Sequence, residues 1–185
     1  MSSTIRHLFL DLEDTVITPV TADGWQHSEL ITTNIELVKR IITEWNPECV
    51  SIFSFALWDK KDLDDFNTII RGKLEEAIGR KLSFVWTLDD DIVPMSCAEK
   101  CRSHGYTTRR EVREFWGKQD SFKLCIKHFF QAGARDGGPT IEAMLLDDDV
   151  YEEFFSWPTY NIHGSIFNID NFRGFRNELD RTTRN

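Results

Sequence analysis

The sequence of 185 residues predicts one domain with an α/β fold, in the form of a doubly wound parallel sheet. Two observations lead to this fold class. The chain contains short apolar segments typical of buried strands and longer segments whose apolar residues recur at helical spacing. These two kinds of segment alternate along the chain. The predicted strands cover residues 7–11, 49–55, 82–88 and 141–149, and the predicted helices cover residues 33–45, 60–78 and 119–131.

Each predicted helix has one apolar face. The first follows the i, i+3, i+4, i+7 pattern and ends at an Asn-Pro pair, and the second ends at a glycine. The residues of the three apolar faces are Val38, Ile41, Ile42 and Trp45; Leu63, Phe66, Ile70, Leu74 and Ala77; and Phe122, Cys125, Ile126 and Phe129. Helices of this kind cover both faces of a parallel sheet, whose strands then end along one edge.

The remaining segments are less regular. Residues 89–118 are polar with no clear period, which indicates a small insertion or lid within the single domain, 1–185. Residues 150–157 suit a short helix that Pro158 ends, and residues 159–167 suit a fifth strand. The tail after these segments is polar and carries four arginines: Arg173, Arg176, Arg181 and Arg184.

Composition excludes several classes of protein. No apolar run approaches the roughly 18 residues of a membrane span, and the first residues lack the apolar core of a secretory signal, so we expect a cytoplasmic protein. The net charge of −9 argues against broad nonspecific binding to nucleic acid.

The four cysteines are expected to be reduced. Cys97, Cys101 and His104 have a C-x3-C-x2-H spacing, for which two readings stay open, a zinc site and ordinary loop residues, because no fourth ligand is evident nearby. The other two are Cys49 and Cys125.

Two predicted strands end in clusters of carboxylates. Asp11, Glu13 and Asp14 follow the first strand, and residues 147–149, three aspartates, end the fourth. Because parallel strands end at the same edge, the clusters can be neighbours, and a divalent cation would relieve their mutual repulsion. Hard oxygen ligands suit Mg²⁺, which expects a phosphate to complete its shell. The competing interpretation is that these acids are solvated loop residues or helix caps, as Asp149 could be.

Four segments in this order resemble the motifs of the haloacid dehalogenase (HAD) superfamily. LFLDLEDTVI, residues 8–17, resembles the first motif, D-x-D-x-T-[LV], and VSIFSF, residues 50–55, is similar to the second, a strand that ends in Ser or Thr. DSFKLCIKHFF, residues 120–130, resembles the third, a lysine near the start of a helix, and AMLLDDDVYEEFF, residues 143–155, resembles the fourth, a strand before paired acids. Within the superfamily, the last segment is most similar to the 3′-phosphatase domain of polynucleotide kinase-phosphatases.

The resemblance implies a HAD-like Rossmannoid core and a Mg²⁺-dependent phosphatase. Asp11 would be the nucleophile that forms an aspartyl-phosphate, and Glu13 would protonate the leaving oxygen and then activate water. The metal ligands would come from Asp11, the backbone carbonyl of Glu13, and Asp148.

The resemblance also assigns the phosphate-binding groups. Ser54 and Lys123 would hold the phosphate oxygens, with Lys118 and Lys127 as rivals for the role of the lysine. Asp147, the other acid of the pair in the fourth motif, is the remaining candidate metal ligand, and orienting Lys123 is the role that the resemblance favours for it.

Two departures from the motif bear on activity. Glu13 stands where the superfamily's phosphatases have Asp, and the extra methylene would shift the proton donor by about 1 Å, which can cost roughly 10²-fold in rate. Asp14 stands where Gly is usual, a position that Asp tolerates when φ is positive.

Two functions follow as hypotheses. The first is a phosphohydrolase acting on a phosphorylated small molecule, including a nucleotide, or on a nucleic-acid 3′ end. The second is a catalytically impaired HAD-like protein that binds a macromolecule, with a protein partner contacting residues 107–118 or the C-terminal tail. Hydrolytic dehalogenation is disfavoured, because Glu13 and the paired acids suit metal and phosphate chemistry.

Overall fold

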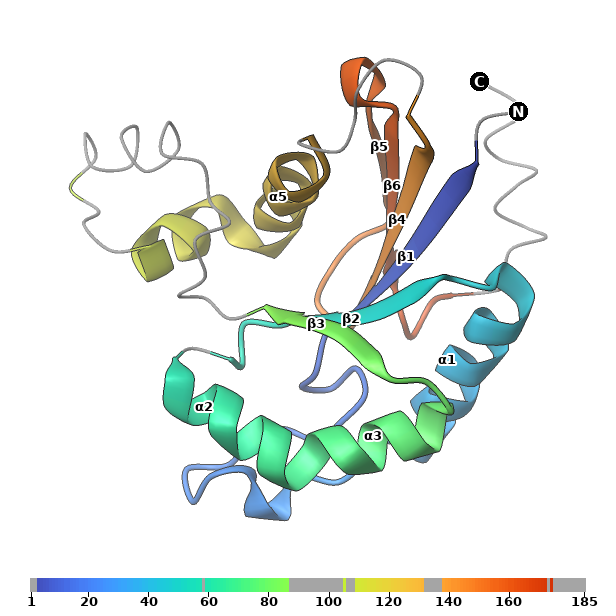
Figure 1. Cartoon of the computed structure of the whole chain (residues 1–185). Helices are drawn as coiled ribbons and strands as arrows, with labels where there is room; N and C mark the ends of the chain where they lie inside the picture. Colours follow the sequence, from blue (N-terminus) through green and yellow to red (C-terminus); the bar gives the residue numbers. More distant parts are fainter. Residues whose placement is uncertain are drawn as a thin grey trace.

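The computed structural model describes residues 3–57, 59–86, 105, 109–131, 138–172 and 174. In the helix over 109–131, side chains are described from residue 117 on. The central element is a six-stranded sheet with the order β3-β2-β1-β4-β6-β5 (Figure 1). The strands are β1 (Thr4–Leu10), β2 (Cys49–Phe53), β3 (Leu82–Trp86), β4 (Thr140–Asp147), β5 (Glu153–Trp157) and β6 (Ile162–Asn168). The first five strands of that order run parallel, and β5 is antiparallel to β6 at one edge. The α/β class and the mostly parallel sheet are therefore confirmed.

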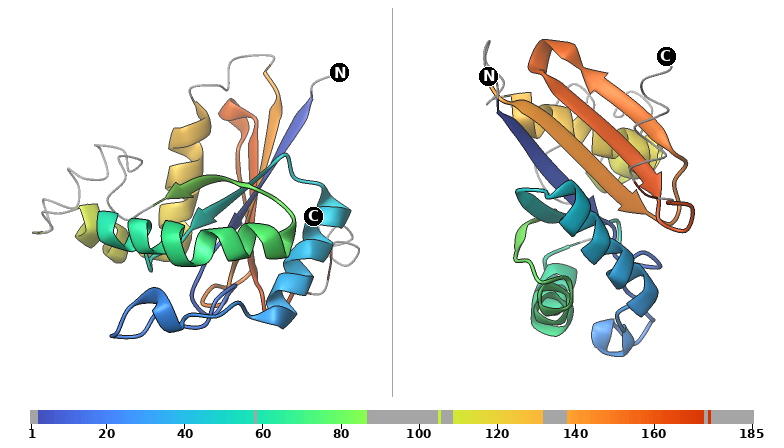
Figure 2. Two further views of the ribbon diagram at one scale, coloured as in Figure 1. Left: turned by 60° about the horizontal axis from the view of Figure 1, so that its bottom comes forward. Right: turned by 90° about the vertical axis from the view of Figure 1, so that its right-hand side faces the viewer.

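The helices belong to two hydrophobic clusters. α1 (Thr32–Trp45), α3 (Arg71–Ile78) and the π-helical segment between α2 (Lys60–Asp65) and α3 pack with one set of strand side chains. α5 (Arg109–Gln131) packs with the other. Along β1, Leu8 and Leu10 join the first cluster, whereas Phe9 joins the second, as alternation along a strand requires. Figure 2 shows α1 and α3 on the opposite side of the sheet from α5.

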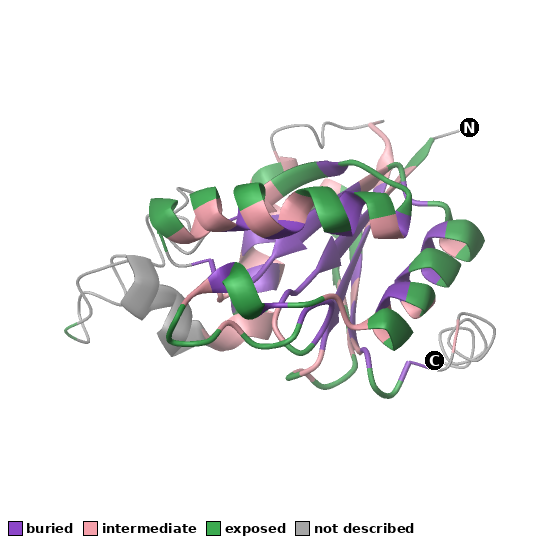
Figure 3. Cartoon of the chain, turned by 90° about the horizontal axis from the view of Figure 1, so that it is seen from below, coloured by how far each residue is buried: buried purple, intermediate pink, exposed green. Residues whose placement is uncertain are grey.

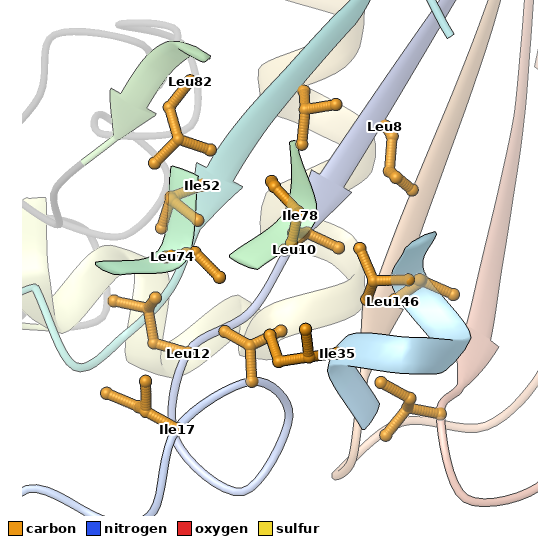
Figure 4. Close-up of a cluster of buried hydrophobic side chains, with 14 of the residues drawn as sticks. Leu8, Leu10, Leu12, Ile17, Ile35, Ile52, Leu74, Ile78, Leu82 and Leu146 are labelled. Atoms are coloured by element: carbon orange, nitrogen blue, oxygen red, sulfur yellow. The ribbon is translucent and has the colours of Figure 1, made fainter. Parts of the chain in front are cut away.

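Most residues of the predicted apolar faces lie in the core, whereas Phe129 of α5 is exposed and Leu63 of α2 is only half-buried. Figure 4 shows side chains of the first cluster, where Leu10 and Leu146 from adjacent strands lie near Ile35 of α1. Most of β4, and β1 from His7 on, are buried beneath helices whose outer faces are exposed (Figure 3), whereas Phe84 of β3 and Phe154 of β5 are exposed. The predicted helix over 60–78 is continuous, with a π-helical segment, Phe66–Ile70, between α2 and α3.

One predicted element is wrong. Residues 150–157 do not form a helix, because Glu153–Trp157 is strand β5, whose side chains alternate between half-buried and exposed. Phe155 packs against Phe122 of α5 and lies opposite Gly164 of β6. This pairing with β6, which local sequence does not reveal, decides the conformation. Pro158 ends the strand and begins a 3-10 turn, Pro158–Tyr160.

The segment predicted as an insertion, 89–118, is partly helical. α5 begins at Arg109, and Gly117 interrupts it with φ 73° and ψ 171°, so a second helical run starts at Lys118. Apart from Gly105, residues 87–108 lie outside the described residues, and so does the predicted cluster of Cys97, Cys101 and His104. Among the helices described, none combines the length and apolar character required to cross a membrane.

Candidate functional site

The carboxyl ends of β1 and β4 bring three aspartates together. The two strands pair in register, with Leu10 opposite Leu146, and the Asp11 amide donates to the Leu146 carbonyl at 2.9 Å. Asp11, Asp147 and Asp148 each offer a carboxylate oxygen, and these oxygens lie within 4.8 Å of one another. The neighbouring acidic strand ends expected from the sequence are therefore present in the structure.

Two of these carboxylates are almost completely removed from solvent. Asp11 is 2% exposed and Asp147 is 0% exposed, whereas Asp148 is half-buried at the edge of the cluster. Lys118 spans the buried pair, with Nζ 2.7 Å from Asp11 Oδ2 and 2.6 Å from Asp147 Oδ2. Although the ammonium is that close, Asp147 Oδ2 has no hydrogen bond of good geometry among the described residues, so its compensation is mainly Coulombic.

Burial and mutual charge shift the ionisation of these groups. Burial raises the pKa of Asp11, and the Lys118 ammonium and the Ser54 hydroxyl oppose that rise. Burial and the charge of Asp11 raise the pKa of Asp147 to about 6. Burial alone would lower the pKa of Lys118, but the two carboxylates outweigh it and raise that pKa. The lysine is therefore a cation between two acids, and burial disfavours the charged form of both acids.

Ser54 lies at this site, one residue beyond β2. Its hydroxyl interacts with the Asp11 carboxylate and also accepts a hydrogen bond from the Ala56 amide at 3.2 Å. The next side chain, Phe55, has its ring centroid 5.8 Å from Lys118 Nζ. The structure thus brings Ser54 to Asp11, the residue with which its predicted role would require it to act.

Asp148 is held by the loop that follows β1. Thr15 Oγ1 donates to Asp148 Oδ1 at 3.1 Å, and Thr15 is itself completely buried. Asp147 Oδ1 accepts from the Asp149 amide at 2.9 Å, which closes a tight turn after β4. Asp149 is exposed at this turn and caps no helix, because the segment after it is not helical.

Glu13 and Asp14 lie in the same loop but outside the cluster of three aspartates. Glu13 Oε1 accepts a hydrogen bond from the Val20 amide at 2.7 Å, so this carboxylate is bound to its own loop. Asp14 is exposed with φ 55°, a left-handed conformation that Asp tolerates.

The lysine near the acids is Lys118, and Lys123 is elsewhere. Lys123 Nζ lies 2.7 Å from both Asp120 Oδ1 and Glu153 Oε1, on the side of α5 that faces β5. The expectation that Asp147 orients Lys123 is therefore wrong. Lys123 follows Lys118 by five residues, which rotates its side chain by about 140° around the helix axis. Lys118 precedes Phe122 by four residues and therefore lies on the same sheet-facing side of the helix.

The residues present fit a hard divalent cation. Three carboxylates and one ammonium leave two negative charges in a mostly buried site. Asp11 Oδ1 is buried and has no hydrogen-bond partner among the residues described, so it lacks the compensation that a buried carboxylate oxygen needs. A set of oxygen donors that converge within 4.8 Å suits Mg²⁺.

Comparison with known protein families, with curated proteins and with solved structures finds no match for this chain.

Proposed function

We propose that this protein is a Mg²⁺-dependent phosphohydrolase of the HAD type, which hydrolyses a phosphate ester through a phosphorylated Asp11. The observation that carries the proposal is the convergence of Asp11, Asp147 and Asp148, with Lys118 between the first two. A buried carboxylate beside a fixed cation and a hydroxyl supports nucleophilic attack on a bound phosphoryl group. The substrate class proposed is a phosphorylated small molecule, including a nucleotide, or a nucleic-acid 3′ end.

The reaction assigns a role to each of five residues: Asp11, Glu13, Ser54, Lys118 and Asp148. A carboxylate oxygen of Asp11 attacks phosphorus, the ester P–O bond breaks, and the leaving oxygen takes a proton from Glu13. Water, deprotonated by Glu13, then attacks the phosphorus and releases phosphate and free Asp11. Lys118 and Ser54 hold the phosphoryl oxygens. Mg²⁺, held by Asp11 and Asp148, would neutralise charge on the phosphoryl group.

One observation favours the second candidate, a catalytically impaired HAD-like protein that binds a macromolecule. The carboxylate of Glu13 is engaged with the Val20 amide at 2.7 Å rather than with the three aspartates. To act as proton donor, the Glu13 carboxyl group must break this hydrogen bond. In a protein without catalytic activity, the hydrogen bond would stay formed, as it is in this structure.

The test is turnover of a reactive aryl phosphate, with and without Mg²⁺. We expect Mg²⁺-dependent release of phosphate that stops on chelation, and complete loss of turnover in Asp11→Asn, which removes the nucleophile while hardly changing volume. A matched control is Asp120→Asn, a half-exposed acid on α5 whose recorded partner is Lys123. Full activity in Asp11→Asn would exclude the mechanism, and metal-independent background rates in all proteins would favour the binding function.

A further inference from the structure

The turn after β4 carries the half-buried member of the acidic cluster, and no helix follows it. Asp148 comes directly after the strand, and the next regular element is β5 (Glu153–Trp157). The main-chain carbonyls of this turn therefore lack the internal hydrogen bonds that a helix would give them. What holds the turn decides where the Asp148 carboxylate lies.

Asn168 supplies the missing hydrogen bonds from the neighbouring strand. It is the last residue of β6 and pairs with Asp147 in the β4–β6 register. Its amide Nδ2 donates to the Asp148 carbonyl at 2.6 Å and to the Val150 carbonyl at 3.1 Å. Its Oδ1 accepts from the Asp170 amide at 3.0 Å. One side chain thus ties the acidic turn to the main chain beyond β6.

The carboxylate of Asp148 is held from the opposite side. Thr15 Oγ1 donates to it at 3.1 Å, and Asn34 Nδ2, from the first turn of α1, donates to the Thr15 carbonyl at 2.9 Å. Asn168 therefore fixes the main chain of Asp148, and Asn34, through Thr15, fixes its side chain.

These restraints oppose a definite force. Asp148 carries a negative charge within 4.8 Å of two other carboxylates and is only half-buried, so without Mg²⁺ repulsion drives it toward solvent. A metal site assembled from a free turn would have to order that turn on binding, which weakens affinity. Asn168 and Asn34 make the ordered turn a property of the protein before any metal arrives.

We propose that Asn168 and Asn34 are positioning residues of the metal site, holding the Asp148 ligand in place from two sides. This inference rests on the proposed function, because it assigns Asp148 to Mg²⁺. Neither asparagine contacts the reacting atoms, so the effect of each lies in metal affinity rather than in the chemical step. Loss of such outer hydrogen bonds around a metal typically weakens binding by about 10- to 100-fold.

The experiment measures Mg²⁺ binding by calorimetry in wild type, Asn168→Ala, Asn168→Asp and Asn34→Ala. Asn168→Asp keeps the Oδ1 acceptor and the size, but turns an oxygen toward two carbonyls. The control is Asn161→Gly, which removes a hydrogen bond to Thr140 at the other end of β6 and keeps a left-handed residue there, where φ is 51°. Asn168→Asp and Asn34→Ala retain a test should Asn168→Ala fail to fold.

We expect wild type and Asn161→Gly to bind Mg²⁺ alike, and the Asn168 and Asn34 variants to bind about 10-fold or more weakly. With an aryl phosphate, the Mg²⁺ concentration for half-maximal rate should rise by the same factor, while kcat at saturating Mg²⁺ stays within a few-fold of wild type. Wild-type affinity in the folded Asn168 and Asn34 variants, or an equal loss in Asn161→Gly, would overturn the inference and leave the proposed function standing. Absence of Mg²⁺ binding to wild type would overturn both.

Discussion

Lys118 and Asp147 form an ion pair in which Nζ lies 2.6 Å from a carboxylate that is fully buried, while the lysine side chain is 17% exposed. The same ammonium reaches Asp11 at 2.7 Å. Lys118 is thus the cation that faces both buried acids at the end of adjacent strands, and it opposes the rise that burial causes in their pKa values.

Lys118→Met should destabilise the protein and strengthen its interaction with Mg²⁺. Without the ammonium, the buried acids repel each other uncompensated, so the free energy of unfolding without metal should fall by about 3 kcal/mol. Because the cluster is then more negative, Mg²⁺ should raise the melting temperature more than in wild type, while turnover is lost. Denaturant titration with and without Mg²⁺ measures both effects.

Lys123→Met is the matched control on the same helix. Lys123 pairs with Asp120 and Glu153, which are 51% and 25% exposed, so its loss should cost about 1 kcal/mol or less. The response to Mg²⁺ should remain that of wild type. Equal responses in the two variants would contradict the assignment of Lys118 to the site.

Substitutions of Glu13 should separate an active enzyme from an impaired one. Glu13→Gln removes the exchangeable proton and should lower the rate of an active enzyme by about 10²-fold or more. In Glu13→Asp the side chain is one methylene shorter, so its carboxylate no longer reaches the Val20 amide. That carboxylate is then free to act on the substrate, and turnover should be kept or raised. Initial rates on an aryl phosphate with Mg²⁺ decide, and no difference among the three proteins would remove Glu13 from the mechanism.

His7 should make the protein less stable in acid. Its ring is 2% exposed, stacks on Phe9, and lies 2.7 Å from the Ser51 hydroxyl. Burial lowers its pKa to about 4, against 6.5 in the unfolded chain. The unfolded state therefore takes up a proton first as pH falls from 6.5 to 4, which removes on the order of 3 kcal/mol of stability over that interval.

Comparison with His7→Asn isolates this contribution from that of other titrating groups, among them Asp147, whose raised pKa acts in the opposite direction. Chemical denaturation of the two proteins between pH 4 and pH 7 should give a difference that shrinks as pH falls. A constant difference would show that His7 does not account for the acid sensitivity.

Gly164 should tolerate no side chain while Phe155 covers it. A Cβ atom at Gly164 would lie 2.0 Å from Phe155 Cζ, so Gly164→Ala should cost about 1–3 kcal/mol through overpacking. Phe155→Leu should relieve the clash, making the double variant less destabilised than the sum of the single ones. A Cβ atom at Gly72 would have no atom within 4 Å, and this residue lies inside the continuous helix over 60–78, so Gly72→Ala should instead stabilise by about 0.5–1 kcal/mol. Additive losses in the Gly164 and Phe155 variants would contradict the contact between these two residues.

Much of the fold follows from local pattern. β1 and β4 are continuous apolar runs because helices cover both of their faces, and such runs are visible in sequence. β5 was missed because its five residues are too few for a period to separate strand from helix, and because pairing with Gly164 and its neighbours decides the outcome. Segments of that length take their conformation from tertiary contacts.

The candidate site was predictable in its acids and less so in its cation. Parallel strands end at one edge, so Asp11 and Asp148 could be placed together from the strand order alone. The lysine could have been chosen from helix phase, since Lys118 extends the apolar face of Phe122 and Ile126, while Lys123 does not. Asn168 carried no signal, because it reaches the site only through the pairing of β6 with β4.

The pairing of β1 with β4 joins residues 136 positions apart in the chain, as in the contact between Arg6 and Glu142. Closing so long a loop is entropically costly, and contacts of this range slow folding. The three aspartates come together only once this closure is complete, whereas the β5–β6 hairpin is local. A cation that binds the aspartates would therefore recognise the finished sheet, so it should slow unfolding and leave the rate of folding almost unchanged.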